Sequence, residues 1–256
     1  QMCIRDSHHF TLKNMNVHLL PTHSSEHITR AATLYESAFP PEERRPTKKW
    51  VTLLGDTESP VTLHIIADEN DNFCGFITLW TLNGFTYAEH FAILPEMRGH
   101  GIGGQIFRQL LEHPSHTPLI LEVEPAEDSP NASRRIRFYE QHGMHLLSHP
   151  YMQPPYSAEF SPLPLCLMAS TDSLTDEQLN SMVRELHKEV YHFEHNREFQ
   201  RLRFQQSVYI DLKLSRRIIF VSKEMKRRLL HFSHRSFCVK QQIVMLSRQN
   251  KIFNYG

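Results

Sequence analysis

The hydrophobic pattern divides residues 10–193 into short runs typical of strands and longer stretches with helical spacing. Runs rich in aromatic and β-branched residues predict strands, and apolar residues three or four positions apart predict helices. The predicted strands are residues 16–20, 61–67, 73–82, 85–94, 118–123, 144–149 and 163–168, and the predicted helices are 24–39, 47–54, 105–112, 128–141 and 174–193. Because strands and helices do not alternate regularly, we expect an α/β (α+β) fold with a mixed, mostly antiparallel central sheet flanked by helices.

A glycine-rich turn connects the strand that ends at Leu94 to the helix that follows. It contains Gly99, Gly101, Gly103 and Gly104. Glycine lets the backbone approach a ligand closely and adopt positive φ. The free N–H groups and the dipole of the following helix attract anions. The turn therefore predicts a phosphate-binding site.

Three kinds of phosphate-binding turn can be compared with this stretch. A Walker loop ends in Gly-Lys-Ser/Thr, which Gly103-Gly104-Gln105 lacks. A dinucleotide fingerprint is present as Gly99, Gly101 and Gly104, with Glu122 as the later acidic residue, so an NAD-dependent oxidoreductase is one hypothesis. Against it, residues 95–98 separate the turn from its strand, and at least two strands come earlier in the chain. The third pattern, Arg-x-x-Gly-x-Gly, is matched from Arg98.

This third pattern resembles the acetyl-CoA loop of the GCN5-related N-acetyltransferase (GNAT) superfamily, which follows the fourth strand. A second stretch, RFYEQHGM from Arg137, resembles the FYE-x-x-GF helix end of the same family. The resemblance covers about residues 10–193 and is greatest to uncharacterised acetyltransferases of Bacteroides-type bacteria. The shared features are EHFA from Glu89, EVE from Glu122, QPPY from Gln153 and EVY from Glu189. The resemblance implies the GNAT fold, with a V-shaped split between strands 4 and 5.

The resemblance also implies an enzyme that moves an acetyl group from acetyl-CoA to a primary amine by direct attack in a ternary complex. The amine must lose a proton before it attacks, and Glu89 on the fourth strand is the candidate base, acting directly or through water. Tyr139 is the candidate acid for the departing CoA sulfur. The residues expected to bind the cofactor are Phe91, Ala92, Ile93, Arg98, Gly99, His100, Gly101, Ile102, Gly103, Gly104 and Asn131. The family's asparagine usually lies seven residues before the tyrosine, where this chain has Ala132.

Strand alternation adds expectations about neighbouring residues. It places Glu89 on one face with Tyr87 and turns His90 away from Glu89, into the core. Trp50 and Trp80 are expected in the core as well. Tyr151 and Tyr156 flank a Pro-Pro loop that would line the acceptor pocket.

Composition restricts the class further. Four cysteines without a C-x-x-C pair suggest neither a zinc ribbon nor a disulfide framework, and no H-E-x-x-H occurs, so we expect no metal. No apolar run reaches the ~20 residues that span a bilayer, so we expect no membrane partner. The N-terminus does not resemble a signal peptide, and a reducing cytoplasm is the simplest setting. We expect a monomer or homodimer.

Charge is distributed unevenly along a chain whose formal net charge is zero. Residues 197–256 hold 14 Lys/Arg and 3 Asp/Glu, whereas residues 1–196 carry a balance of −11. The change marks a boundary near Glu194. We therefore expect an unstructured leader or scar over residues 1–9, a GNAT domain over 10–193 and a basic C-terminal extension over 194–256. A nucleic-acid-binding protein acting through this extension is the other alternative, although we do not expect nucleic acid as a partner.

An acidic cluster at the end of the fifth strand bears on the acceptor. The cluster consists of Glu122, Glu124, Glu127 and Asp128. An acidic rim concentrates cationic ligands, so we expect a cationic acceptor such as a polyamine, aminoglycoside, lysine or peptide amine. The alternative is a solvated loop that serves only solubility.

Overall fold

The computed structural model describes residues 16–112 and 117–193. By internal contacts the chain divides into two units, residues 1–196 and 197–256. All described residues belong to the first unit. The expected leader over residues 1–9 and the expected basic extension over 194–256 lie outside the described residues.

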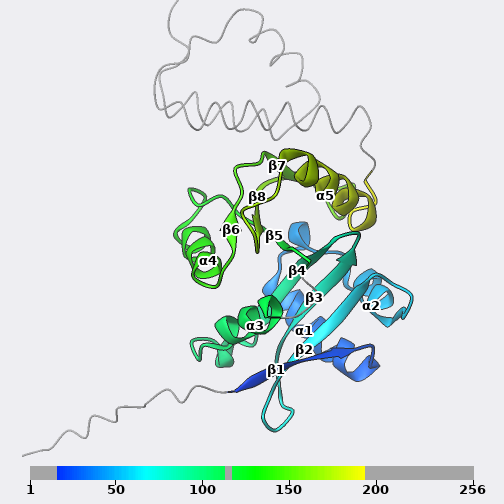
Figure 1. The fold of residues 1–256 in the computed structure, drawn as a ribbon. Helices are drawn as coiled ribbons and strands as arrows, with labels where there is room; N and C mark the ends of the chain where they lie inside the picture. Colours follow the sequence, from blue (N-terminus) through cyan, green and yellow to red (C-terminus); the bar gives the residue numbers. More distant parts are fainter. Residues whose placement is uncertain (1–15, 113–116, 194–256) are drawn as a thin grey trace, which may run out of the picture. The chain divides into compact units, whose positions relative to one another are not determined.

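A central sheet with the order β1-β2-β3-β4-β5-β8-β6 organises the first unit (Figure 1). Within the described residues every paired neighbour is antiparallel except β4 and β5, and the short β7 pairs with β8. The strands are β1 (Val17–Thr22), β2 (Val61–Asp68), β3 (Phe73–Leu82), β4 (Phe85–Ile93), β5 (Leu119–Val123), β6 (His145–Leu146), β7 (Tyr151–Gln153) and β8 (Leu163–Ala169). This confirms the predicted mixed, mostly antiparallel sheet. The described strands do not form the doubly wound parallel sheet that a dinucleotide fingerprint requires.

Helices cover both faces of this sheet. They are α1 (Ser25–Ala38), α2 (Thr47–Gly55), α3 (Ile102–Leu111), α4 (Pro130–Gln141) and α5 (Asp176–Glu189), with 3-10 turns at Pro41–Glu43 and Pro95–Met97. On one face Tyr35 of α1 stacks on Trp50 of α2, with ring centroids 4.2 Å apart. On the other face Phe107 of α3 meets Phe91 of β4.

Three element predictions near the C-terminus were inaccurate. The predicted strand 144–149 is reduced to the two residues of β6, and β7 was missed because the prolines that follow it favoured a loop. The last helix begins at Asp176 instead of residue 174. A capping box explains its start, because Thr175 and Gln178 each bond the other's backbone N–H.

The sheet opens between β4 and β5. Their parallel pairing covers only Thr86–Leu119, Tyr87–Ile120 and Ala88–Leu121. Beyond Ala88 the strands are no longer paired, so the edge of β4 toward β5 is left without a partner strand. The predicted split between strands 4 and 5 is thus present in the sheet.

Gly75 in β3 tests how closely β3 and β4 approach at the open end of the sheet. A Cβ atom there would lie 2.3 Å from the Ala92 carbonyl oxygen, closer than real Cβ contacts. Gly75→Ala is expected to lower the free energy of unfolding by about 2 kcal/mol, as overpacked sites do. Gly55→Ala is the control, because a Cβ at Gly55 meets no atom within 4 Å. Equal urea midpoints for the two variants would contradict the close approach.

Candidate active site

The glycine-rich turn leads into the N-terminus of α3. Gly99 and Gly101 have φ of +83° and +73°, in the left-handed region that glycine adopts without strain. The first bond within the helix runs from the Gln105 N–H to the Gly101 carbonyl at 3.2 Å. No side chain caps this terminus. The N–H groups of residues 102–104 therefore remain available for an anion, as the predicted phosphate site requires.

Gly103 and Gly104 also serve packing, which the sequence did not predict. A Cβ on Gly103 would lie 2.9 Å from the Phe138 ring, and one on Gly104 would lie 2.4 Å from the His142 ring. The side chains of both positions are therefore excluded by packing against α4. Their absence allows α3 and α4 to approach, and only their backbone N–H groups remain as candidate phosphate contacts.

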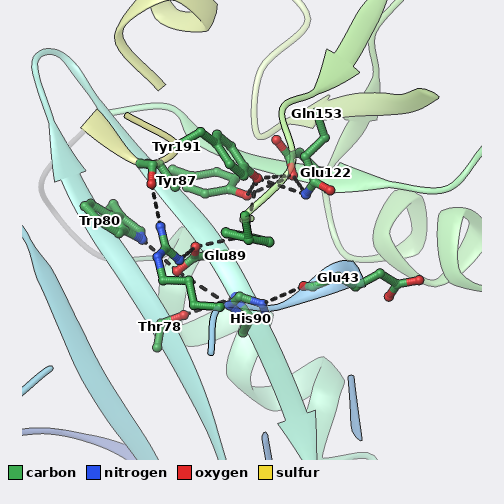
Figure 2. A network of polar contacts seen from close by, with 12 residues as sticks. Glu43, Thr78, Trp80, Tyr87, Glu89, His90, Glu122, Gln153 and Tyr191 are labelled. Carbon is green, nitrogen blue, oxygen red and sulfur yellow. Dashed lines mark hydrogen bonds and ion pairs between the residues drawn. The ribbon is translucent and has the colours of Figure 1, made fainter. Parts of the chain in front are cut away.

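A β-bulge controls the direction of Glu89 and His90 in β4. These two residues stand opposite the single residue Thr78, because the register of β3 and β4 shifts between Ile77 and Leu79. The His90 N–H donates to the Thr78 hydroxyl at 3.1 Å. The bulge interrupts alternation, so Glu89 and His90 lie side by side (Figure 2), with His90 Nδ1 3.5 Å from Glu89 Oε2. The expectation that His90 points away from Glu89 was wrong, although His90 is buried as expected.

Both carboxylate oxygens of Glu89 have bonding partners at the split. Its side chain is 1% exposed and forms an ion pair with Arg45 Nη1. Trp80 Nε1 donates to Glu89 Oε2 at 2.8 Å, and the Tyr156 hydroxyl donates to Oε1 at 3.0 Å. Trp80 is buried as expected, yet it also donates this hydrogen bond.

Arg45 connects these partners of Glu89 to the C-terminal end of α5. Its Nη2 donates to the Val190 carbonyl at 2.6 Å. The guanidinium also lies over the Trp80 and Tyr156 rings, at 5.3 and 4.7 Å from their centroids. The Arg45 guanidinium therefore contacts an anion, a backbone carbonyl and two aromatic rings inside the protein.

The surroundings fix Glu89 in its charged form. Burial alone would raise the pKa of Glu89, but Arg45, helped by His90 and the Trp80 N–H, outweighs burial and holds the pKa well below its ordinary value. Glu89 lies on β4 just beyond its last residue paired with β5. A carboxylate with so low a pKa is a weak proton acceptor, which bears on its proposed role as base.

A second carboxylate, Glu122 of β5, lies across the split within a set of neutral donors. Its Oε2 accepts from the Tyr87 hydroxyl at 3.0 Å, from Gln153 Nε2 at 2.6 Å and from the Tyr191 hydroxyl at 2.8 Å. The Tyr151 hydroxyl donates to Oε1. Figure 2 shows Tyr87, Gln153 and Tyr191 converging on it. Burial raises the pKa of Glu122, and the four hydrogen bonds offset that rise only in part.

Glu122 is therefore not part of an exposed acidic rim, as the sequence suggested. Glu124 is half-buried and forms an ion pair with Arg135. Burial and the neighbouring Glu124 both raise the pKa of Glu43, in the turn before α2, while Arg135 opposes them. Glu43, Glu124 and Arg135 thus interact at this edge, and Glu127 and Asp128 of the predicted cluster are exposed.

Tyr139 lies on α4 beside the ring of Phe107, with centroids 5.0 Å apart. Burial raises the pKa of Tyr139 to about 12, so its hydroxyl stays protonated at neutral pH. Within the described part of the chain this hydroxyl has no hydrogen-bond partner. It is free to donate to a ligand, as an acid for a thiolate must be.

The remaining candidate cofactor-binding residues on β4 differ in the direction of their peptide groups. Leu94 N–H donates to the Cys74 carbonyl on β3, and Ala92 is paired with Phe76, so the peptide groups of Ala92 face β3. By alternation those of Phe91 and Ile93 face the open edge. Arg98 is exposed and donates from Nε to the Ile93 carbonyl at 3.0 Å. His100 is half-buried, Ile102 buried and Asn131 exposed.

Sequence reasoning missed Arg45, Trp80 and Tyr191 as site residues. Arg45 stands in a charged stretch between two predicted helices, and Tyr191 comes near the end of the last predicted helix. The only available signal was the EVY motif, which suggested kinship but no role. Tyr156 was expected to line the acceptor pocket, and it does lie in the polar network.

Comparisons with known proteins agree with this arrangement. A family profile described as an acetyltransferase (GNAT) domain matches residues 60–143. A solved structure from Bacteroides thetaiotaomicron, assigned to the GNAT acetyltransferases, is 32% identical with a TM-score of 0.63, and the match covers 70% of this chain and 100% of that one. The chain therefore belongs to the GNAT family of N-acetyltransferases, and the predicted likeness to Bacteroides-type members is confirmed.

More distant matches include a spermidine N-acetyltransferase from Vibrio cholerae, solved in complex with CoA and spermine. It is 13% identical with a TM-score of 0.46, and the match covers 60% of this chain and 94% of that one. No curated protein matches the chain. Among the described residues, no helix is long and apolar enough to cross a membrane, and no group of three His, Cys, Asp or Glu side chains is arranged to hold a metal ion.

The Arg45–Glu89 pair generates a stability prediction. Arg45→Met leaves a buried carboxylate without its counter-charge and should lower the free energy of unfolding by about 3–5 kcal/mol. Glu89→Gln should cost a similar amount for the converse reason. The double variant should lose clearly less than the sum of the two, as measured by urea unfolding. Additive losses would contradict a tightly coupled pair.

The same pair predicts a dependence on pH. The folded-state pKa of Glu89 lies below the unfolded value of about 4.3. Its contribution is therefore complete above that value and declines as the pH falls below it. The stability difference between wild type and Glu89→Gln should shrink on acidification. A difference that grows as the pH falls would show that the sign is wrong.

Proposed function

We propose that the protein transfers the acetyl group of acetyl-CoA to a primary amine by direct attack in a ternary complex. One observation carries this proposal. The unpaired edge of β4 runs from the buried carboxylates to the uncapped N-terminus of α3, in a chain that belongs to the GNAT family. The edge offers hydrogen bonds to an extended ligand, and the helix terminus offers N–H groups to its phosphates.

Acetyl-CoA fits the residues present. The N–H groups of Ile102, Gly103 and Gly104, with the positive-φ turn at Gly99 and Gly101, would hold the pyrophosphate. Arg98 and His100 flank this turn, and Asn131 lies exposed at the start of α4. The peptide groups of Phe91 would pair with the pantetheine arm, because the Ile93 carbonyl already accepts from Arg98. When bound, acetyl-CoA supplies an activated acyl group as a thioester.

Phe91 and Ile93 present their backbone groups at the split, and we assign the oxyanion contact to the Ile93 N–H. A backbone donor fixed by the sheet costs no reorganisation as negative charge develops. The Ala92 peptide faces β3 and contributes by holding its two neighbours in register.

Tyr139 is the proposed acid. Its hydroxyl is protonated and has no other partner among the described residues, so it can donate to the sulfur as the C–S bond breaks. Glu89 remains a proposed site residue, with a role suited to its surroundings. As a fixed anion paired with Arg45, it orients the Tyr156 hydroxyl at the split.

The acceptor is proposed to be a small cationic amine or a peptide amine. Glu43 and Glu124 lie near each other, and the pKa of Glu43 is raised partly by Glu124. Two neighbouring carboxylates at the edge of the split would raise the local concentration of cations and their rate of encounter. An acceptor with a phosphate group would be repelled.

An acceptor screen tests the proposed function directly. Purified protein is incubated with acetyl-CoA and a panel of polyamines, aminoglycosides, lysine peptides and amino sugar phosphates, and free CoA thiol is detected. We expect thiol release that requires an amine and is fastest with a cationic one. Release with none of the amines would contradict the function, and a preference for an anionic acceptor would contradict the proposed substrate class.

Gly101→Asp tests the phosphate site. A carboxylate at the N-terminus of α3 would repel the pyrophosphate, so the affinity for acetyl-CoA should fall by at least 100-fold in calorimetry. Gly101→Asn is the matched control, because it has nearly the same size, tolerates positive φ and carries no charge. The aspartate variant should bind much more weakly than the asparagine variant. Equal affinities of the two would remove the turn from the site.

Tyr139→Phe tests the proposed acid. The hydroxyl acts only as the C–S bond breaks, so kcat should fall by about 100-fold while the dissociation constant of acetyl-CoA changes little. Phe138→Leu serves as a packing control, because it alters the same helix surface without removing a hydroxyl. A Tyr139→Phe variant with wild-type kcat would show that the residue serves packing alone.

A further inference from the structure

Two carboxylates lie at the split, and only one is paired with a cation. Glu89 is paired with Arg45, whereas the partners of Glu122 are three phenols and an amide. Two tyrosines connect the carboxylates. The Tyr156 hydroxyl donates to Glu89 and lies 3.4 Å from the Tyr191 hydroxyl, which in turn donates to Glu122.

Glu89 is a poor destination for a proton. Its neutralisation would leave the Arg45 guanidinium buried, held only by the Val190 carbonyl and two aromatic rings. An unpaired buried cation is strongly unfavourable. Arg45 would still donate to the Val190 carbonyl at the end of α5, but its positive charge would have lost its counter-charge.

Glu122 can accept a proton without leaving a charge unpaired. Its partners Tyr87, Tyr151, Tyr191 and Gln153 are neutral whether Glu122 is charged or not, and a phenol oxygen can accept from a protonated carboxyl. Burial raises the pKa of Glu122 while Arg45 lowers that of Glu89, and such divergence separates acid from base in many sites.

The exposure of the residues indicates where a proton would enter. Tyr87, Tyr151, Gln153 and Tyr191 are buried, whereas Tyr156 is half-buried. Tyr156 therefore offers its oxygen to an acceptor amine at one end of the chain of hydroxyls. Burial raises the pKa of both relay tyrosines well above the ordinary value, so neither is a stable phenolate. Each must give up a proton as it receives one.

We propose that Glu122 is the final proton acceptor of the acetyl transfer, and that Tyr156 and Tyr191 carry the proton to it from the amine. The ammonium ion gives a proton to Tyr156 as the Tyr156 hydroxyl turns from Glu89 and gives its own proton to Tyr191, and Tyr191 gives one to Glu122. The neutral nitrogen attacks the thioester carbonyl carbon, so a C–N bond forms and the C–S bond breaks. The second nitrogen proton reaches the sulfur through Tyr139, and Glu122 returns its proton to water.

This inference rests on the proposed function and is tested first in the free protein. Glutamate carboxyls labelled with ¹³C are followed by NMR as a function of pH in wild type and in Glu122→Gln. We expect a resonance that titrates above the ordinary glutamate range and is missing from the variant, whereas the signal of Glu43, whose pKa is also raised, stays in both. The groups that face Glu122 are Tyr87, Tyr151, Tyr191 and Gln153, with Glu89, Arg45 and Tyr156 beyond them, and none of these produces such a signal. Its absence from wild type overturns the proposal.

The pH profile of kcat/KM, with the acceptor found by the screen, tests the relay. Wild type should reach a plateau above the pKa of Glu122. Glu122→Gln should be at least 100-fold slower at neutral pH, and its rate should rise tenfold per pH unit across that plateau, because only free amine then reacts. Tyr191→Phe, which keeps the ring packed on Tyr156, should show the same rise. Loss of packing alone would lower the curve without changing its shape.

The control is Glu159→Gln, an exposed glutamate on the loop that carries Tyr156, which should keep the wild-type profile. If Glu122→Gln does not fold, Tyr191→Phe and Tyr156→Phe decide the question. Wild-type profile shapes in both tyrosine variants overturn the relay. Wild type that acetylates no amine would instead count against the proposed function, so the two failures are distinguishable.

Discussion

The structure depends on how two buried negative charges are held where β4 and β5 part. A carboxylate removed from water is unfavourable unless it is paired or hydrogen-bonded. Glu89 is stabilised by a cation and Glu122 by four neutral donors, and these partners come from distant parts of the chain. The opening in the sheet and the charge within it are therefore stabilised together.

The partners also explain why the termini of the described unit matter to the site. The family profile matches residues 60–143. That span contains both carboxylates and the glycine-rich turn, but Arg45, Gln153, Tyr156 and Tyr191 lie outside it. The matched span thus supplies the proposed cofactor surface together with Trp80, Tyr87 and His90, and the flanking segments supply the remaining partners of the two carboxylates.

Features formed by residues close together in the sequence could be predicted, whereas contacts between distant residues could not. The turn from Arg98 to Gly104 is local, so its glycines and the following helix could be recognised directly. Most strands could also be predicted, because each is a short apolar run, but β7 was missed and the strand predicted over residues 144–149 was too long. The orientation of His90 could not be predicted, because a bulge against Thr78 interrupts alternation. The Arg45–Val190 contact joins positions 145 residues apart, so no local sequence pattern predicts it. In the sequence, Gly103 and Gly104 cannot be told apart from Gly101. Only the short distances from a Cβ at these positions to the Phe138 and His142 rings show that packing excludes side chains there.

The central claim is that the open edge of β4 and the N-terminus of α3 form a site for acetyl-CoA. Titration calorimetry of the full chain with acetyl-CoA and, separately, with NAD tests it most directly. The account predicts saturable binding of acetyl-CoA at one site per chain and no detectable heat from NAD. Saturable binding of NAD without binding of acetyl-CoA would contradict it.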